Sequence, residues 1–468
     1  MRLTPLLVGV LCCLSFVPAN AETAEKAPNL IPNPELRLDS KGLPIGWKLW
    51  TPRPILAPAG TAVVRDGVPM LSLHADRYEC DGRWVAVVNG IEPGKYYRLE
   101  AAYSTENVGW PTMSVAGLLI WADYPDGRGE IQTDYLDDER TDAGPWHRSY
   151  RTIQAPEGAR SVRVELGLRV SKGGTVYWKN IRLVAVPPPA PRRVRIVTTM
   201  IYPWPNPSVE ANTRLMANML DAASRERPDI VLFSEGVVDR GVWGVPLSQK
   251  AQTIPGPLTQ MLSEKARKYH TYIITTLHER DGDLYHNTAV LIDRQGRVAG
   301  TYRKVHLALA ETDAGLTPGD NFPVFDTDFG RIGILICYDN WFVEPARILR
   351  MEGAEIIFLP LAGDGVPGHA DVIFRERAID NGVYFVTSAT VSDTESRIID
   401  PAGEVLAEAT GSSDMAVKEI DLNREWRGRY LSVASGVGEG KSLYIKERRP
   451  DTYSILCKGA DQPVPANK

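Results

Sequence analysis

The stretch Gly330-Arg-Ile-Gly-Ile-Leu-Ile-Cys-Tyr-Asp-Asn-Trp-Phe-Val-Glu-Pro-Ala-Arg347 decides how the second half of the chain folds. Its apolar run, 333–336, is short and β-branched, which favours a buried strand over a helix. Helical spacing begins at Pro345, so Cys337 is expected at the corner where a strand passes into a helix. The backbone N–H of Tyr338 is expected to point out of that corner toward an oxyanion on a bound carbonyl. Cys337 is therefore a candidate nucleophile, and a buried core thiol is the alternative.

The composition of the chain limits its class and its partners. With 468 residues, 43% apolar and 24% charged, it is typical of a globular protein of more than one domain. The net charge of −5 argues against a nucleic-acid or anionic-membrane partner, and the Cys and His residues lack metal-ligand spacing. No apolar run after the leader approaches the ~20 residues of a membrane span. We expect a small-molecule ligand, no cofactor and no metal.

Residues 1–21 have the pattern of a secretory signal peptide. Met1-Arg2 is followed by the apolar stretch 6–17 and by Ala19-Asn-Ala21. This is the order of a charged start, a hydrophobic core and a cleavage site. We therefore expect export to the periplasm or the extracellular space.

Without the leader the chain keeps three cysteines, Cys80, Cys337 and Cys457. An odd number is not a disulfide framework, even in an oxidising compartment. We expect Cys80 and Cys457 to be free buried thiols, and a bridge between them is the alternative.

Residues 28–186 have the pattern of an all-β domain. Segments rich in β-branched and aromatic residues recur between Gly, Pro and Asp turns, and none has helical spacing. The expected strands are Thr61–Arg65, Trp84–Val88, Tyr96–Ala102, Val115–Trp121, Val162–Leu168 and Thr175–Ala185. The prediction is a β-sandwich of jelly-roll type.

Seven of the eleven tryptophans lie in this domain. Exposed indoles can stack on sugar rings, but sandwich cores bury tryptophan routinely, so we expect core packing for most of them. The opening Asn29-Leu-Ile-Pro-Asn33, with Gly46-Trp47 and Trp178-Lys-Asn-Ile-Arg-Leu183, resembles galactose-binding-like modules, which include carbohydrate-binding domains. This resemblance leaves a glycan open as a ligand of the module.

A proline-rich linker, 187–193, separates this domain from a second one at 194–456. Pro187-Pro-Pro-Ala-Pro191 removes backbone donors and favours an extended chain. Beyond it strands and helices alternate, which indicates a layered α/β domain. The expected strands are Val194–Met200, Ile230–Ser234, Thr271–Thr275, Thr288–Asp293, Ile332–Ile336, Ile356–Leu359, Tyr384–Thr387 and Ser396–Asp400. The expected helices are Val209–Glu226, Leu258–Tyr269, Pro345–Met351 and Ala370–Asn381, and residues 457–468 form a tail.

Six segments in order resemble the nitrilase superfamily of carbon–nitrogen hydrolases. They are Tyr285-His-Asn-Thr-Ala-Val-Leu-Ile-Asp293, Tyr302-Arg-Lys-Val-His-Leu307, Val324-Phe-Asp-Thr-Asp-Phe-Gly-Arg-Ile-Gly-Ile-Leu-Ile-Cys-Tyr-Asp339, Gly353-Ala-Glu-Ile-Ile-Phe-Leu-Pro360, Arg375-Glu-Arg-Ala-Ile-Asp-Asn-Gly-Val-Tyr384 and Ser396-Arg-Ile-Ile-Asp-Pro-Ala-Gly403. The resemblance spans about Val194–Leu456 and implies a four-layer αββα sandwich. It also implies a homodimer or higher homo-oligomer formed through the helices after Cys337 and around Ala370–Asn381.

The resemblance further implies a Glu-Lys-Glu-Cys constellation, which falls on Glu235, Lys304, Glu311 and Cys337. Taken alone, each of these carboxylates and the lysine would be an ordinary surface charge. Because the loop after Lys304 varies in length in this family, Asp313 or Asp320 could stand in place of Glu311.

The chemistry of these residue types agrees with the implied roles. Carboxylates near a thiol raise its pKa, so we expect Cys337 to rest as the thiol and to need Glu235 as general base. Lys304 and the Tyr338 N–H would stabilise the tetrahedral oxyanion, while Glu311 orients Lys304 or the substrate nitrogen. Glu235 would protonate the leaving nitrogen and then activate the water that cleaves the thioester.

His306 is the rival base, because it lies two residues from Lys304 and on the same face if the segment is a strand. A lone histidine is more often structural, and the resemblance gives it no proton-transfer role.

The residues after the nucleophile narrow the substrate. Cys337-Tyr-Asp-Asn-Trp-Phe-Val-Glu344 resembles the amidase and carbamoylase branches, with Val343 where they usually carry proline, whereas strict nitrilases usually carry Cys-Trp-Glu. We expect hydrolysis of a small amide or N-carbamoyl compound, with specificity set by the loops Gly236–Val245 and Leu361–His369. The alternatives are an N-acyltransferase that uses the same thioester, and a glycan-binding protein with an inactive hydrolase domain.

Overall fold

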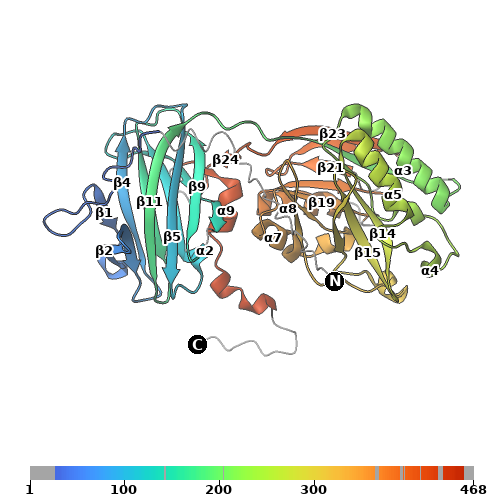
Figure 1. The fold of residues 1–468 in the computed structure, drawn as a ribbon, viewed down its shortest axis with the longest axis horizontal. Coiled ribbons are helices and arrows are strands. Elements are labelled where there is room, and N and C mark those ends of the chain that lie inside the picture. Colours follow the sequence, from blue (N-terminus) through green and yellow to red (C-terminus); the bar gives the residue numbers. More distant parts are fainter. Residues whose placement is uncertain are drawn as a thin grey trace, which may run out of the picture. The chain divides into compact units, whose positions relative to one another are not determined.

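The structure is a computed structural model that describes residues 27–141, 144–203, 205–363, 368–390, 394, 396–411, 413–430 and 436–457. The expected signal peptide and all but the first residue of the expected tail lie outside these residues. The chain divides into two compact units (Figure 1). Unit 1 holds the described part of Met1–Ala190 together with Arg429–Gly438 and 449–457, and unit 2 holds Pro191–Gly428 and Glu439–Arg448. The described part contains no helix that is long and apolar enough to cross a membrane.

Two antiparallel sheets build unit 1. Their strand orders are β1-β4-β10-β6-β7 and β2-β3-β11-β5-β9-β8. The strands are β1 (Trp47–Trp50), β2 (Ala59–Arg65), β3 (Val68–His74), β4 (Asp81–Asn89), β5 (Tyr96–Glu106), β6 (Val115–Ala122), β7 (Glu130–Tyr135), β8 (Asp138–Thr141), β9 (His147–Gln154), β10 (Ser161–Arg169) and β11 (Thr175–Val186). The expectation of no helix here is wrong, because η1 (Pro54–Leu56) and α2 (Pro111–Ser114) interrupt the strands. Each begins with proline, which suits a first helical turn.

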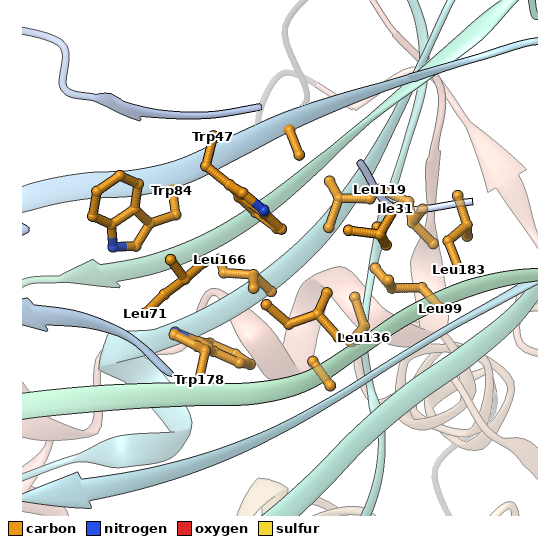
Figure 2. Close-up of a cluster of buried hydrophobic side chains, with 14 of the residues drawn as sticks. Ile31, Trp47, Leu71, Trp84, Leu99, Leu119, Leu136, Leu166, Trp178 and Leu183 are labelled. Atoms are coloured by element: carbon orange, nitrogen blue, oxygen red, sulfur yellow. The ribbon is translucent and has the colours of Figure 1, made fainter. Parts of the chain in front are cut away.

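The core of unit 1 lies between these sheets and is rich in tryptophan. Trp47, Trp84 and Trp178 lie among leucines contributed by strands of both sheets (Figure 2). Trp121 is buried as well, whereas Trp50 and Trp110 are exposed. Core packing is therefore confirmed for four of the tryptophans. The jelly-roll topology and the galactose-binding-like identity stay predictions.

Polar residues explain why the strand β7 was missed in the sequence. Gln132 and Asp134 interrupt its apolar pattern, yet both are buried. The Gln132 amide and the Trp121 indole N–H donate to the same Asp134 oxygen at 2.8 and 2.9 Å. A buried polar cluster that satisfies itself is compatible with the core but hides the alternation that identifies a strand.

Unit 2 contains two six-stranded sheets, in the orders β16-β15-β14-β13-β12-β23 and β17-β18-β19-β20-β21-β22. The first is built from β12 (Arg193–Ile201), β13 (Ile230–Leu232), β14 (Tyr272–Asp281), β15 (Leu284–Ile292), β16 (Val298–Arg303) and β23 (Ser413–Asp421). The second is built from β17 (Val324–Asp326), β18 (Arg331–Ile334), β19 (Ile356–Pro360), β20 (Tyr384–Ser388), β21 (Ser396–Ile399) and β22 (Val405–Ala409). The central strands β12, β13 and β14 are parallel, and so are β18, β19 and β20.

Helices cover the outer face of each sheet, which gives the four-layer αββα order that was predicted (Figure 1). The first sheet packs against α3 (Val209–Ala223) and α5 (Pro257–Tyr269), and the second against α7 (Val343–Met351) and α8 (His369–Asn381). The sequence of β13 is apolar throughout because both of its faces are buried. Ile230 and Leu232 face the core between the sheets, while Val231 faces the helices.

Several predicted details differ in the structure. The helix expected to reach Glu226 ends at Ala223 and continues as the 3-10 turn η2 (Ser224–Glu226). The strands β16, β17, β22 and β23 were not predicted, because they alternate weakly or carry charge. All three described cysteines are free, and Cys80 is buried as expected, but Cys457 is exposed.

The C-terminal part of the chain alternates between the two units. Val437 extends the edge of β7, where Thr133 N–H donates to the Val437 carbonyl at 2.9 Å and Val437 N–H donates to the Ile131 carbonyl at 3.1 Å. Further on, Arg449 and Asp451 hydrogen-bond Tyr78. Between these segments, α9 (Gly440–Lys446) belongs to unit 2. The stretch expected as part of one domain, 194–456, thus contributes two segments to unit 1.

A chain that begins at Pro191 should keep the fold of unit 2 but lose the partners of these two segments. Without β7 and Tyr78 the segments lose their hydrogen bonds and become locally unfolded. We expect trypsin to cut after Arg429 and Arg448 faster than in the full chain, as followed by mass spectrometry of the fragments. Equal protection in both chains would contradict this dependence, and loss of the cooperative unfolding of unit 2 would show that the two units fold as one.

Candidate active site

Loops that leave the carboxyl ends of parallel strands meet at one place in unit 2. Glu235 follows β13, Cys337 follows β18, and Leu361-Ala362 follows β19. The Ala362 N–H donates to Glu235 Oε2 at 3.0 Å, and Cys337 Sγ lies 4.0 Å from the Gly363 carbonyl oxygen. In open α/β sheets, ligands bind outside these carboxyl ends. The two sheets therefore each contribute one reactive side chain to the same site.

Cys337 occupies a strained corner. Its backbone φ of +45° lies in the left-handed region, which costs a non-glycine residue about 1–2 kcal/mol. The chain passes from β18 into the 3-10 turn η4 (Cys337–Trp341) and only then into α7. The predicted strand-to-helix corner is thus present with an added turn. Tyr338 is the second residue of η4, where backbone N–H groups have no partner within the helix. Its role as an oxyanion donor stays a prediction.

A closed set of hydrogen bonds joins Glu235, Lys304, Glu311 and Asn287, and we call it the Glu–Lys ring. Lys304 Nζ donates to Glu235 Oε1 at 3.0 Å and to Glu311 Oε2 at 2.8 Å. Asn287 Nδ2 donates to Glu235 Oε1 and to Glu311 Oε1, both at 2.8 Å. Two donors and two carboxylates therefore alternate around the ring. The structure brings the predicted Glu235, Lys304 and Glu311 into direct contact.

Different elements hold the members of the ring. Lys304 directly follows β16, and its backbone N–H donates to the Asn287 carbonyl of β15 at 2.9 Å. Glu311 lies in the short helix α6 (Leu309–Asp313), where its Oε2 also accepts from the Ala308 N–H at 2.8 Å. The alternatives Asp313 and Asp320 are exposed, and neither takes the position beside Lys304 that Glu311 occupies.

Asn287 is the member of the ring that sequence reasoning missed. It lies in the segment from Tyr285 to Asp293, but an uncharged amide suggests no acid–base chemistry. Its side chain is 6% exposed and donates one N–H to each carboxylate. It thereby joins Glu235 and Glu311 without adding charge. The signal that could have found it is its place on a strand beside the Lys304 segment.

Charge and burial set the protonation of Lys304. The side chain is 2% exposed, and this burial alone would lower its pKa. The charges of Glu235, Cys337 and Glu311 outweigh the burial, and the pKa of Lys304 is raised above its ordinary value. Lys304 is therefore an ammonium, which acts as a fixed positive charge and not as a base.

The thiol of Cys337 shows the opposite balance. Burial and the charge of Glu235 raise its pKa to about 12, against the opposing charge of Lys304. A thiolate is the reactive nucleophile. Since the thiol is the resting form at neutral pH, Cys337 needs a base, and Glu235 is the carboxylate whose charge acts most on it.

Asp339 explains what His306 does. The Asp339 carboxylate is fully buried and accepts from Ile336 N–H at 3.0 Å and from Tyr302 Oη at 2.6 Å. It also accepts from His306 N–H at 2.9 Å, and His306 Nδ1 lies 3.0 Å from it. The imidazole of His306 stacks on Phe342 with ring centroids 4.0 Å apart. His306 thus anchors the corner of Cys337, and its contacts are those of a structural residue.

Unit 2 is similar to a known family of enzymes. The family described as carbon-nitrogen hydrolase matches residues 193–429, so the match ends before the expected Leu456. The omega-amidase NIT2 of Homo sapiens is 34% identical over 227 residues, covering 44% of this chain and 79% of the relative. A nitrilase of Pyrococcus abyssi is 35% identical over 213 residues, covering 43% of this chain and 77% of the relative. The solved structure of a carbon-nitrogen hydrolase from Helicobacter pylori is 24% identical with a TM-score of 0.46, and the match covers 57% of this chain and 99% of that chain.

Replacing Asn287 should impair turnover more than stability. Asn287→Ala removes both amide donors and leaves Glu235 and Glu311 joined only by Lys304. Glu311 Oε1 then lacks its donor, and Glu235 is held by one donor fewer beside the thiol. If this mispositioning of the base removes about 1.4–2.8 kcal/mol of transition-state stabilisation, kcat falls about 10- to 100-fold. Asn287→Asp, which adds a third carboxylate of the same size, should lose more. Parent values of kcat and of the unfolding temperature in Asn287→Ala would contradict the role of the ring.

The raised pKa of Cys337 predicts how the rate of its alkylation by iodoacetamide depends on pH. Because only the thiolate reacts well and the pKa is about 12, the rate at Cys337 should keep rising from pH 7 to pH 10. Mass spectrometry of the labelled peptides measures this rate, with the exposed Cys457 as a reference in the same chain. A plateau in the rate at Cys337 near neutral pH would show a stabilised thiolate and contradict the need for a base.

Proposed function

Because this chain belongs to the carbon-nitrogen hydrolase family, we propose that it cleaves a small amide or N-carbamoyl compound through a thioester on Cys337. It is a hydrolase of carbon–nitrogen bonds other than peptide bonds. The observation that carries the proposal is the Glu–Lys ring. Its carboxylate Glu235 is the acidic group that acts most strongly on the pKa of the Cys337 thiol.

In the proposed acylation step, Glu235 takes the proton from Cys337 as Sγ attacks the substrate carbonyl. The carbon–sulfur bond forms, and the carbonyl oxygen becomes an oxyanion. Lys304 is a preorganised cation within reach of this site, and the Tyr338 N–H is a second donor. Glu235 then gives its proton to the nitrogen as the carbon–nitrogen bond breaks, which releases ammonia and leaves a thioester.

In the proposed deacylation step, Glu235 takes a proton from water, and the resulting hydroxide attacks the thioester. The carbon–sulfur bond breaks, and the thiol regains its proton from Glu235. An amide and water thus yield a carboxylic acid and ammonia. An N-carbamoyl amine and water yield ammonia, carbon dioxide and the free amine.

The surroundings of Asp339 support the amide branch over nitrile hydrolysis. Four donor groups fill the space around its short carboxylate, which is fully buried. The longer glutamate of strict nitrilases would have to displace these donors. The relatives named omega-amidase also support an amide substrate.

Three further expectations stay predictions. These are export of the chain, a glycan ligand of unit 1 and self-association of unit 2. Ile348 of α7 and Val372 of α8 are exposed apolar side chains on the two helices through which self-association is expected.

A substrate panel tests the proposed function. The full chain is incubated with small amides, N-carbamoyl amines and nitriles, and ammonia and carbon dioxide are measured. We expect ammonia from amides or carbamoyl compounds and little turnover of nitriles. Cys337→Ala should lose essentially all activity while its unfolding temperature stays close to the parent's.

Other outcomes would redirect the assignment. Comparable turnover by Cys337→Ala would refute the thioester mechanism. Dominant turnover of nitriles would overturn the branch while leaving Cys337 as nucleophile. Absence of hydrolysis of all three substrate classes, together with acyl transfer to an added amine, would favour the acyltransferase. Absence of both hydrolysis and acyl transfer would favour a glycan-binding protein with an inactive hydrolase domain.

A further inference from the structure

We infer that His278, held by Asp239, forms a substrate subsite beside the Glu–Lys ring and donates a hydrogen bond from Nε2 to an acceptor oxygen on the substrate outside the scissile amide. This inference rests on the proposed function and specifies its substrate class. The favoured substrates are amides that carry a second carbonyl or a carboxylate.

The strand register places His278 on the same face as the ring. His278 of β14 lies directly opposite Asn287 of β15 in an antiparallel pair. Directly opposite residues project to the same face, with Cβ atoms about 4.5–5.5 Å apart. Asn287 is the residue that bonds Glu235 and Glu311.

A second contact on β14 agrees with this placement. Thr276 lies two residues before His278 and so projects to the same face. Its Oγ1 accepts a hydrogen bond from the Gly236 N–H at 2.7 Å, directly after Glu235. The side chain of Leu277, between them, belongs to the core on the helix side of the sheet. His278 therefore lies at the carboxyl end of β14, at the same edge as Glu235.

Asp239 fixes which nitrogen of His278 is available. Asp239 ends the 3-10 turn η3 (Val237–Asp239), four residues after Glu235, and its carboxylate is hydrogen-bonded to His278 Nδ1. Among the described residues, Nε2 has no hydrogen-bond partner in the protein. The side chain of His278 is 24% exposed, whereas that of Asp239 is 12% exposed. The imidazole is thus oriented from one side and open to a ligand on the other.

The charges around His278 favour a proton on Nε2. Burial alone would lower the pKa of His278, but Asp239 outweighs it, and the pKa is raised. Lys250 of α4 (Leu247–Lys250) opposes this rise, and Glu235 adds to it. Asn287 on the facing strand is uncharged. The imidazolium then carries N–H on both nitrogens, one for Asp239 and one for the substrate.

The His278–Asp239 pair has a different role from the Glu–Lys ring. Lys304 is enclosed by carboxylates at the reacting centre, so it can serve the oxyanion but not a remote group. His278 supplies a donor beyond that centre, and a hydrogen bond that involves a charged group is stronger than one between neutral groups. Specificity built on such a donor rejects analogues that lack the acceptor.

Three amides of equal chain length test the inference, one ending in a methyl group, one in a neutral carbonyl group and one in a carboxylate. The parent should prefer the two acceptor-ended amides. His278→Leu should lower kcat/KM for these two by about 10- to 100-fold, mainly through KM, and leave the methyl-ended amide within about twofold. Which of the two suffers more tells whether the natural acceptor is neutral or anionic.

The control variant is His270→Asn. His270 caps α5 at the opposite end of β14 with a φ of +54°, a conformation that asparagine tolerates. This variant should behave as the parent on all three amides. Asp239→Asn keeps an acceptor for Nδ1 but removes the charge that raises the pKa of His278. The pKa of His278 should therefore fall, and the rise of KM with pH for the acceptor-ended amides should begin at a lower pH than in the parent.

The pH dependence has a definite sign. Below the raised pKa of His278 the Nε2 donor is present, and above it the donor is lost. The KM of the acceptor-ended amides should therefore rise with pH in the parent, but not in His278→Leu.

The outcomes separate this inference from the proposed function. Equal losses of His278→Leu on all three amides would show that the histidine only positions η3, and would overturn the subsite. An unchanged profile, or a parent without preference for acceptor-ended amides, would overturn it too. Absence of turnover of every amide by the parent would instead refute the proposed function, and the subsite with it. Equal unfolding temperatures of the variants show that each comparison is made on folded protein.

Discussion

The site depends on one buried charge, the ammonium of Lys304. Taking a lone ammonium out of water is costly, and the cost is offset only where opposite charges and hydrogen bonds surround it. Glu235 and Glu311 supply both, from the end of β13 and from α6. These elements must therefore meet wherever Lys304 is buried. Since buried ion pairs contribute little net stability, the arrangement is better explained by the chemistry it serves than by the fold it supports.

Asp339 adds a second constraint that aligns the nucleophile with this charge. Tyr302 and His306 flank Lys304 two residues away on either side, and both hydrogen-bond the carboxylate of Asp339. Asp339 in turn lies two residues after Cys337. Asp339 thus joins the corner of Cys337 to the segment of Lys304 through hydrogen bonds on either side of that lysine. A strained φ at Cys337 can persist because these contacts over-determine the corner.

The sequence predicts the charged part of this site well and the neutral part poorly. Glu235 and Cys337 follow apolar strands, where an ionisable side chain interrupts a clear pattern, and Lys304 lies in one of the six ordered segments that resemble the family. Asn287 and His278 interrupt nothing, and their proximity depends on how β14 pairs with β15. The same holds for Val437, whose place at the edge of β7 depends on a tertiary contact between residues far apart in the chain. Properties that reside in a single segment could be predicted, and those that reside in strand register could not.

That register has a local cause, which lies away from the chemistry. The hairpin joins β14 to β15 through Gly282-Asp283, with Asp281 opposite Leu284. Gly282 has a φ of +58°, and a Cβ atom there would meet no atom within 4 Å, so only the backbone conformation demands glycine. A slip of β15 by one residue against β14 would turn Asn287 to the helix side of the sheet, away from His278, and leave Glu235 and Glu311 joined by Lys304 alone. The two-residue turn therefore helps to set both the acid–base ring and the subsite beside it.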